Sequence, residues 1–185
     1  HFVNLLRTGK DWGLRLTFEI QEEAGGLSQA VGLAEPFARG DKLLVLLGDN
    51  IFTHDLSGPV KKFEQAGKGA MIFAKEVEHP EHYGVIEMDG DKVVSIVEKP
   101  KQPKSNLAQT GVYLYDERVF DLIKNLKPSE RGELEITDLN NFYVKDGTML
   151  CEVMDGYWID AGTSHDELLA ANNRVAELVK EGKLE

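Results

Sequence analysis

Two aspartates, each placed at the end of an apolar run, are the residues best suited to carry chemistry in this sequence. Asp49 follows the run 43–47 (LLVLL), and Asp160 follows Trp158-Ile159. Such a run predicts a strand buried on both faces, and ligands of open α/β sheets lie beyond the carboxyl ends of their strands. Mg²⁺ is commonly held by one or two carboxylates together with substrate phosphates, so the pair suggests one metal site. Taken singly, each aspartate also fits an ordinary cap of the following turn.

A second candidate is the sequence Glu98-Lys99-Pro100. A carboxylate accepts hydrogen bonds from neighbouring sugar hydroxyls, and a lysine ammonium is a point charge suited to a phosphate. Adjacent Glu98 and Lys99 can therefore hold the two halves of a sugar phosphate. Spacing alone favours a plainer interpretation, a strand that ends in a charged surface turn.

The pair Gly25-Gly26 precedes an expected helix. Without Cβ atoms it can present backbone N–H groups to an anion or a flat base, and it fits a plain turn equally well. The longer signatures GxGxxG, GxxxxGK, GxSxG and HExxH are absent. The sequence therefore supports no Rossmann dehydrogenase, P-loop enzyme, acyl-transfer site or HExxH metal site, and the histidines receive no role.

Composition limits the classes of partner. The 185 residues include 32 acidic and 21 basic side chains, for a formal net charge of −11, which argues against nucleic acid as a partner. The single cysteine, Cys151, lies in an apolar run and is predicted to be a buried packing thiol. No apolar segment approaches the roughly 18 residues that span a bilayer, and no signal peptide opens the chain. These features predict a cytoplasmic protein without a membrane segment.

The hydrophobic pattern alternates between helix and strand. We expect one α/β domain with a mixed, mostly parallel sheet, helices on both faces, and an antiparallel hairpin around Asp89-Gly90. The predicted strands cover residues 15–21, 43–47, 70–74, 84–88, 92–98, 107–115 and 149–154. The predicted helices cover residues 2–9, 27–34, 60–66, 119–126, 133–144 and 166–181.

Several motifs occur here in the order found in one enzyme family. They are residues 21–30 (QEEAGGLSQA), 47–50 (LGDN), 83–85 (YGV), 98–100 (EKP), 131–138 (RGELEITD) and 157–163 (YWIDAGT). In this order the sequence resembles the sugar-1-phosphate nucleotidylyltransferases, and within them the glucose-1-phosphate thymidylyltransferases. The resemblance covers essentially all 185 residues. It implies a Rossmann-like nucleotidyltransferase fold.

The resemblance also implies an activity, a cofactor and a site. The family transfers a nucleoside monophosphate from dTTP to glucose 1-phosphate, giving dTDP-glucose and pyrophosphate, with Mg²⁺ held by two aspartates. By likeness these are Asp49 and Asp160. The other residues implied are Gln21 and Gly26 for the base, Gly84 and Glu98 for sugar hydroxyls, Lys99 for the sugar phosphate, and Gln109, Tyr113 and Arg131 on the sugar side. A homo-oligomer, commonly a tetramer, is also implied.

The sequence departs from the family in one respect. The family's glycine-rich loop, GGxGTRLxPxT, has no counterpart here. Residues 1–185 are therefore expected to be a nucleotidyltransferase domain without its first βα segment, inactive on its own. Two alternatives stay open: a non-catalytic module that binds a nucleotide sugar, and a UTP-dependent sugar-1-phosphate uridylyltransferase. The preference for base and sugar cannot be read from these motifs, since one methyl group is worth only about 1 kcal/mol.

Overall fold

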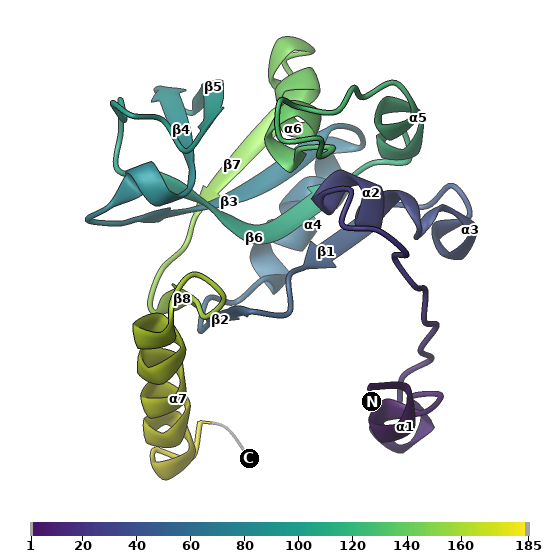
Figure 1. Cartoon of the computed structure of the whole chain (residues 1–185), viewed down its shortest axis with the longest axis vertical. Helices are drawn as coiled ribbons and strands as arrows, with labels where there is room; N and C mark the ends of the chain where they lie inside the picture. The colour runs from purple at the N-terminus through teal and green to yellow at the C-terminus, as the bar shows by residue number, and fades with distance from the viewer. Residues whose placement is uncertain (1, 184–185) are drawn as a thin grey trace.

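The centre of the structure is a 6-stranded sheet with the order β5-β4-β6-β3-β7, in which β1 also pairs with β6 (Figure 1). This computed structural model describes residues 2–183. The strands are β1 (Leu43–Leu46), β2 (Asn50–Phe52), β3 (Ala70–Glu76), β4 (Gly84–Asp89), β5 (Lys92–Glu98), β6 (Leu107–Tyr115), β7 (Met149–Val153) and β8 (Trp158–Asp160). The α-helices are α1 (Phe2–Leu6), α2 (Leu27–Gly32), α3 (Glu35–Ala38), α4 (Ser57–Ala66), α5 (Val119–Lys124), α6 (Ile136–Lys145) and α7 (His165–Lys180), and 3₁₀ turns cover Lys10–Trp12 and Pro80–His82.

The sheet is mixed, as predicted. Strands β1, β3 and β4 all pair antiparallel with β6, and they therefore share one direction. Strand β7 joins them, because it runs parallel to β3. Most strands thus point the same way, although most neighbouring pairs are antiparallel because β6 lies between them.

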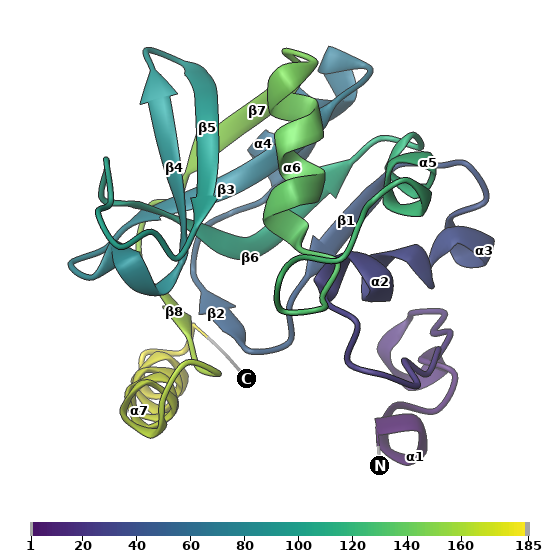
Figure 2. The same ribbon diagram turned by 45° about the horizontal axis from the view of Figure 1, so that its top comes forward.

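Helices cover both faces of the sheet, which also agrees with the prediction (Figure 2). Along β3, Ala70, Ile72 and Ala74 pack with one buried cluster, and Met71 and Phe73 pack with another. The first cluster includes buried residues of α2, α5 and α6, and the second includes Phe63 of α4. The period of two in β3 is thus satisfied by a helical layer on each side.

The predicted antiparallel hairpin is confirmed. Strands β4 and β5 pair from Gly84 opposite Glu98 to Asp89 opposite Lys92. Gly90 lies in the turn with φ 58°, a left-handed conformation that glycine adopts without a steric penalty. The hairpin carries the Glu98-Lys99 pair back toward the first residue of β4.

Three expectations about local structure are wrong. Residues 15–21 form no strand, because no described strand lies beside them to complete their hydrogen bonds, and Ile20 is 75% exposed. The run 43–47 is buried on one face only: Leu44 and Leu46 are 44% and 52% exposed, while Leu43 and Val45 pack on the core. The helix predicted from 133 begins at Ile136, because the Leu134 N–H donates to the Gly25 carbonyl, 2.8 Å away.

Cys151 packs against the core from β7, as predicted. Burial raises the pKa of its thiol to about 12, which keeps it protonated and unreactive at neutral pH. None of the helices in residues 2–183 has the length and apolar character needed to cross a membrane. Helix α7 begins after Ser164, whose hydroxyl accepts the Glu167 N–H at 3.1 Å.

Candidate active site

A cavity of about 430 Å³ opens where one edge of β6 is left without a neighbouring strand. Strand β1 pairs with residues 112–115 of β6, and β4 meets the same edge at Ala108. The intervening residues 109–111 therefore face the cavity. Thirteen residues with polar or charged side chains give this cavity its polar character: Asp49, His82, Tyr83, Glu98, Lys99, Gln109, Thr110, Tyr113, Arg131, Glu133, Glu135, Asp160 and Thr163.

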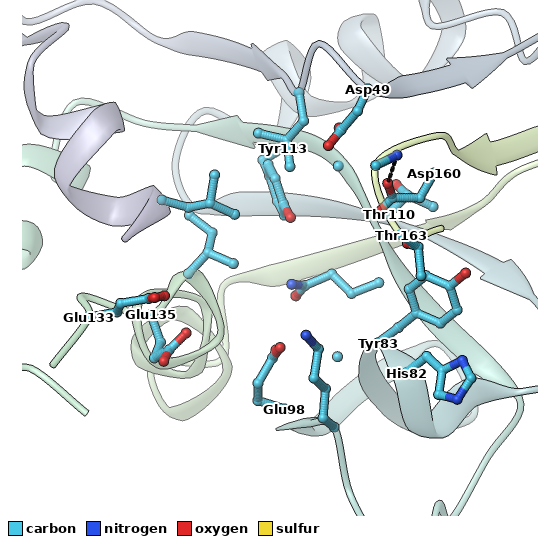
Figure 3. A pocket seen from close by; sticks show the side chains of 18 of the residues that line it. Asp49, His82, Tyr83, Glu98, Thr110, Tyr113, Glu133, Glu135, Asp160 and Thr163 are labelled. Atoms are coloured by element: carbon cyan, nitrogen blue, oxygen red, sulfur yellow. Dashed lines mark hydrogen bonds between the residues drawn. The ribbon is translucent and has the colours of Figure 1, made fainter. Parts of the chain in front are cut away.

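Asp49 and Asp160 converge at one end of the cavity (Figure 3). The cause is the pairing of β2 with β8, in which Asn50 lies opposite Asp160, while the Ala161 N–H donates to the Asp49 carbonyl at 2.8 Å. A Cβ atom on Gly162 would lie 2.6 Å from Asp49 Oδ2 and 3.3 Å from Asp160 Oδ1. Both carboxylates therefore border the space that the missing side chain of Gly162 leaves open.

The electrostatics at this end favour a cation. Burial, followed by the nearby charge of Asp49, raises the pKa of Asp160, and the Gly162 N–H, donating at 2.9 Å, partly opposes that shift. No group of three His, Cys, Asp or Glu side chains suited to a metal occurs in residues 2–183. A pair of hard oxygen ligands without a full protein cage fits Mg²⁺, which keeps water or substrate phosphate in its remaining positions.

Asn50, which the sequence reasoning missed as a site residue, holds this end of the cavity together. Its Oδ1 accepts from the Gly111 N–H and from the Trp158 indole N–H, each at 2.8 Å. Its Nδ2 must then face the other way, where it donates to Asp49 Oδ1 at 2.9 Å. Asn50 thereby links β6, β8 and Asp49. Its place directly after Asp49 in the motif 47–50 was the available signal.

The opposite end of the cavity is formed by the β4–β5 hairpin, β6 and the start of α6. The Thr137 hydroxyl donates to Glu98 Oε2 at 2.8 Å, and a Cβ atom on Gly84 would lie 3.3 Å from that oxygen and 3.4 Å from Gln109 Nε2. Figure 3 shows Glu98 across the cavity from Asp49 and Asp160, with Tyr113 between them. Burial raises the pKa of the Tyr113 hydroxyl well above its usual value, so it is neutral and able to donate.

Lys99 lines the cavity with an unusual backbone conformation. Its φ is 42°, in the left-handed region that side chains other than glycine rarely adopt. The Lys99 N–H donates to the Tyr83 carbonyl at 3.0 Å, which fixes the turn after β5 against the residue before β4. Strain of this kind concentrates at functional sites, where the surrounding structure holds it in place.

Arg131 lies at the rim of the cavity and is already paired. Its guanidinium donates to Glu133 at 3.2 Å and to Glu135 at 3.1 Å. These carboxylates, Glu135 first, raise the pKa of Arg131 further. Arg131 is therefore a cation at the rim of the cavity whose charge is balanced by carboxylates of the same segment.

Gln21 and Gly26, predicted from the resemblance to contact the base, lie outside the lining of this cavity. Gln21 Nε2 donates to the Gly26 carbonyl at 3.2 Å and to Gln29 Oε1 at 2.7 Å. Gly26 has φ 97°, and a Cβ there would lie 2.6 Å from the Leu134 carbonyl oxygen. Leu27, the next residue, does line the cavity. The Gly25-Gly26 turn thus brings the start of α2 against the segment before α6.

The described histidines lie in loops or at the ends of helical turns, as expected. His82 is exposed at the end of the 3₁₀ turn Pro80–His82, and it lines the cavity beside Tyr83. His54 lies elsewhere: its Nδ1 accepts the Asp155 N–H at 3.1 Å, and its Nε2 is buried without a hydrogen-bond partner in the described chain. Only the fold could reveal either environment, because both residues stand in polar sequence.

Comparison with known proteins identifies similarity to nucleotidyltransferases. Residues 1–177 match the family described as nucleotidyl transferase. The chain is 42% identical over 171 residues to a glucose-1-phosphate thymidylyltransferase of Neisseria meningitidis serogroup A, covering 90% of the chain and 59% of that protein. It is 43% identical over 176 residues to a glucose-1-phosphate thymidylyltransferase of Xanthomonas campestris pv. campestris, covering 93% of the chain and 59% of that protein. The chain thus spans 59% of the length of each relative.

A solved structure has the same fold. It is a crystal structure from Bacillus anthracis, assigned as a glucose-1-phosphate thymidylyltransferase in complex with a sucrose. The two align with a TM-score of 0.87 and 46% identity, over 92% of this chain and 69% of the other.

Proposed function

The chain belongs to the nucleotidyl transferase family, and from that premise we propose that the protein which carries it transfers a thymidylyl group from dTTP to glucose 1-phosphate, forming dTDP-glucose and pyrophosphate. The observation that carries this proposal is the two-ended cavity. Two converging carboxylates stand at one end, and an acceptor, a lysine and an amide stand at the other. This arrangement suits a nucleotide phosphate beside a phosphorylated sugar.

We propose that Asp49 and Asp160 hold Mg²⁺. The donor set of two carboxylate oxygens at the edge of an open space supports this assignment. When bound, the ion supplies positive charge against the developing negative charge on the α-phosphate. Asn50 keeps Asp49 Oδ1 engaged and leaves Oδ2 on the side of Gly162.

At the other end we propose that Glu98 accepts from sugar hydroxyls and Lys99 neutralises the sugar phosphate. The attacking phosphate oxygen is already anionic, so no general base is needed, and these residues act by alignment and charge neutralisation. Gly84 leaves room for the sugar, and Tyr113 and Arg131 complete the sugar side. Gln21 and Gly26, beside Leu27, are proposed to meet the base at the margin of the cavity.

The test is turnover by the complete polypeptide that carries residues 1–185. Incubation with dTTP, glucose 1-phosphate and MgCl₂ is expected to release pyrophosphate and to form dTDP-glucose, identified by mass. Binding of dTDP-glucose in calorimetry without any turnover would instead favour the non-catalytic module. Faster turnover with UTP than with dTTP would favour the uridylyltransferase. We also propose a homo-oligomer, commonly a tetramer in this family, which light scattering on the complete polypeptide checks.

A further inference from the structure

A chain of three polar side chains runs from the interior of the sheet to the cavity. The Tyr115 hydroxyl lies 2.6 Å from Asn140 Oδ1, and Asn140 Nδ2 lies 2.9 Å from Gln109 Oε1. Tyr115 and Asn140 are fully buried, and Gln109 is 8% exposed. Tyr115 and Gln109 lie on β6, and Asn140 lies on α6, so the chain crosses from the sheet to the helix and back.

The buried Tyr115 hydroxyl determines which group donates and which accepts in each of these hydrogen bonds. Among the described residues, Asn140 Oδ1 is the only acceptor within hydrogen-bonding range of the Tyr115 hydroxyl. A buried O–H group without an acceptor is strongly disfavoured, so Tyr115 donates to Oδ1. Asn140 must then turn its Nδ2 toward Gln109, and only the Gln109 oxygen can accept from it.

This order leaves the amide nitrogen of Gln109 for the cavity. Gln109 Nε2 lies 3.4 Å, and Glu98 Oε2 lies 3.3 Å, from the point where Gly84 would carry a Cβ atom. A donor and an acceptor thus border the same small space. The Thr137 hydroxyl occupies one lone pair of Glu98 Oε2, which leaves the second lone pair of this oxygen for a ligand hydroxyl.

We propose that Asn140, oriented by Tyr115, is a positioning residue that keeps the Gln109 amide with its NH₂ group toward the cavity. Gln109 then donates to one hydroxyl of the sugar phosphate while Glu98 accepts from a neighbouring one. The inference rests on the proposed function, since it assigns the sugar end of that cavity. If the amide were reversed, two acceptors would face the sugar, and one hydroxyl contact would be lost.

The hydrogen-bonded chain Tyr115–Asn140–Gln109 is called the relay here. Tyr115→Phe tests it, and Tyr143→Phe is the matched control. Both tyrosines are buried in the same core cluster, and each hydroxyl makes one hydrogen bond, Tyr143 to Asp116 Oδ1 at 3.0 Å. Only the Tyr115 hydroxyl connects to Gln109. The complete polypeptide is assayed for the KM of glucose 1-phosphate and the KM of dTTP, and its thermal unfolding is measured alongside.

The expected result for Tyr115→Phe is a rise of about three- to tenfold in the KM of glucose 1-phosphate, the loss expected for one hydrogen bond, with the KM of dTTP unchanged within about twofold. Tyr143→Phe should lower the unfolding temperature at least as much, because its partner Asp116 is a buried carboxylate, and should leave both KM values near the wild type. Equal effects of the two variants on the KM of glucose 1-phosphate, or no effect of either, would overturn the relay.

Monodeoxy analogues of glucose 1-phosphate locate the contact. For the analogue that lacks the hydroxyl facing Gln109, wild type, Tyr115→Phe and Gln109→Leu should have KM values within about twofold of one another. Asn140→Asp keeps the acceptor for Tyr115 and removes the donor to Gln109, so it should follow Tyr115→Phe. A selectivity for the deoxy analogues that is identical in all variants contradicts the proposal. A wild-type polypeptide that turns over no sugar 1-phosphate contradicts the proposed function instead.

Discussion

Asn50 and Asp160 lie directly opposite each other in the antiparallel pair β2–β8, although 110 positions separate them in the sequence. The pairing places Asp49, the neighbour of Asn50, beside Gly162, two residues after Asp160. The pairing of two short strands thus brings the two carboxylates together, which no local sequence feature specifies. A further consequence is that the metal end of the cavity depends on pairing between two three-residue strands.

Replacing either aspartate tests the proposed metal pair. Asp49→Asn and Asp160→Asn are each expected to lower Mg²⁺-dependent turnover of the complete polypeptide by at least about 10²-fold, because one charged oxygen ligand is lost. Far-UV circular dichroism should be unchanged, since neither side chain is part of the core. The measurement is pyrophosphate release across a MgCl₂ titration. Wild-type turnover in either variant would contradict the pair, as would full activity of the wild type in EDTA.

Asp160→Asn should also alter how the free energy of unfolding depends on pH. Burial and the charge of Asp49 raise the folded-state pKa of Asp160 above its ordinary value of 3.8. A carboxyl with a raised pKa holds its proton more tightly when folded, so stability is lost as pH rises through the window that begins near 3.8. Without metal, Asp160→Asn should therefore be more stable than the wild type at pH 7, with the difference shrinking toward pH 3. Urea unfolding in EDTA at several pH values measures this, and a difference independent of pH would refute it.

Gly162→Ala tests whether the space beside the carboxylates matters. The new Cβ would lie 2.6 Å from Asp49 Oδ2, so that carboxylate must move. The nearest atoms all belong to the side chains of Asp49 and Asp160, so the backbone fold should be preserved. Misplacement of a catalytic group by about 1 Å can cost about 10²-fold, and we expect a loss of turnover of that order. Gly48→Ala is the control, because a Cβ at Gly48 meets nothing within 4 Å. Equal activities of the two variants would count against the site.

Lys99 combines a binding charge with a strained backbone, and two substitutions separate these properties. Lys99→Ala and Lys99→Gly both remove the ammonium group, and each should weaken glucose 1-phosphate binding by about 10- to 100-fold with less effect on dTTP. The glycine variant should be the more stable of the two by up to about 1 kcal/mol, because φ 42° costs glycine little. Calorimetry and urea unfolding give the two quantities. Equal losses for both ligands would make Lys99 a structural residue.

Asp116 and Arg118 form an ion pair just after the end of β6, outside the lining of the cavity. Asp116 is fully buried and accepts from the Arg118 guanidinium, the Gly69 N–H and the Tyr143 hydroxyl. Arg118→Ala should lower the free energy of unfolding by about 1–3 kcal/mol, less than for a fully buried pair because the arginine is partly exposed. Lys124→Ala, which breaks the exposed pair with Glu35, should change the unfolding midpoint little. The opposite ranking would contradict this account.

Local sequence determined much of the fold. The alternation in residues 84–98 with Asp89-Gly90 between its halves predicted the β4–β5 hairpin, and the apolar run 107–115 predicted β6. These features depend on neighbours in the chain, which is why pattern and turn chemistry suffice. The predicted strand over 15–21 failed for the opposite reason: a strand needs hydrogen bonds from a partner that local sequence does not specify.

The sequence by itself also named the chemistry, in Asp49, Asp160 and the Glu98-Lys99 pair. Only the tertiary structure decided that these residues share one cavity. Strands β1 and β4 pair with the same edge of β6, and the β2–β8 pair brings Asp160 next to Asp49. It also revealed Asn50 as a link and the line from Tyr115 to Gln109, since a hydrogen bond depends on distance and direction across the fold. Residue type determines which reactions or contacts a side chain can make, and long-range packing determines the distances and directions at which it makes them.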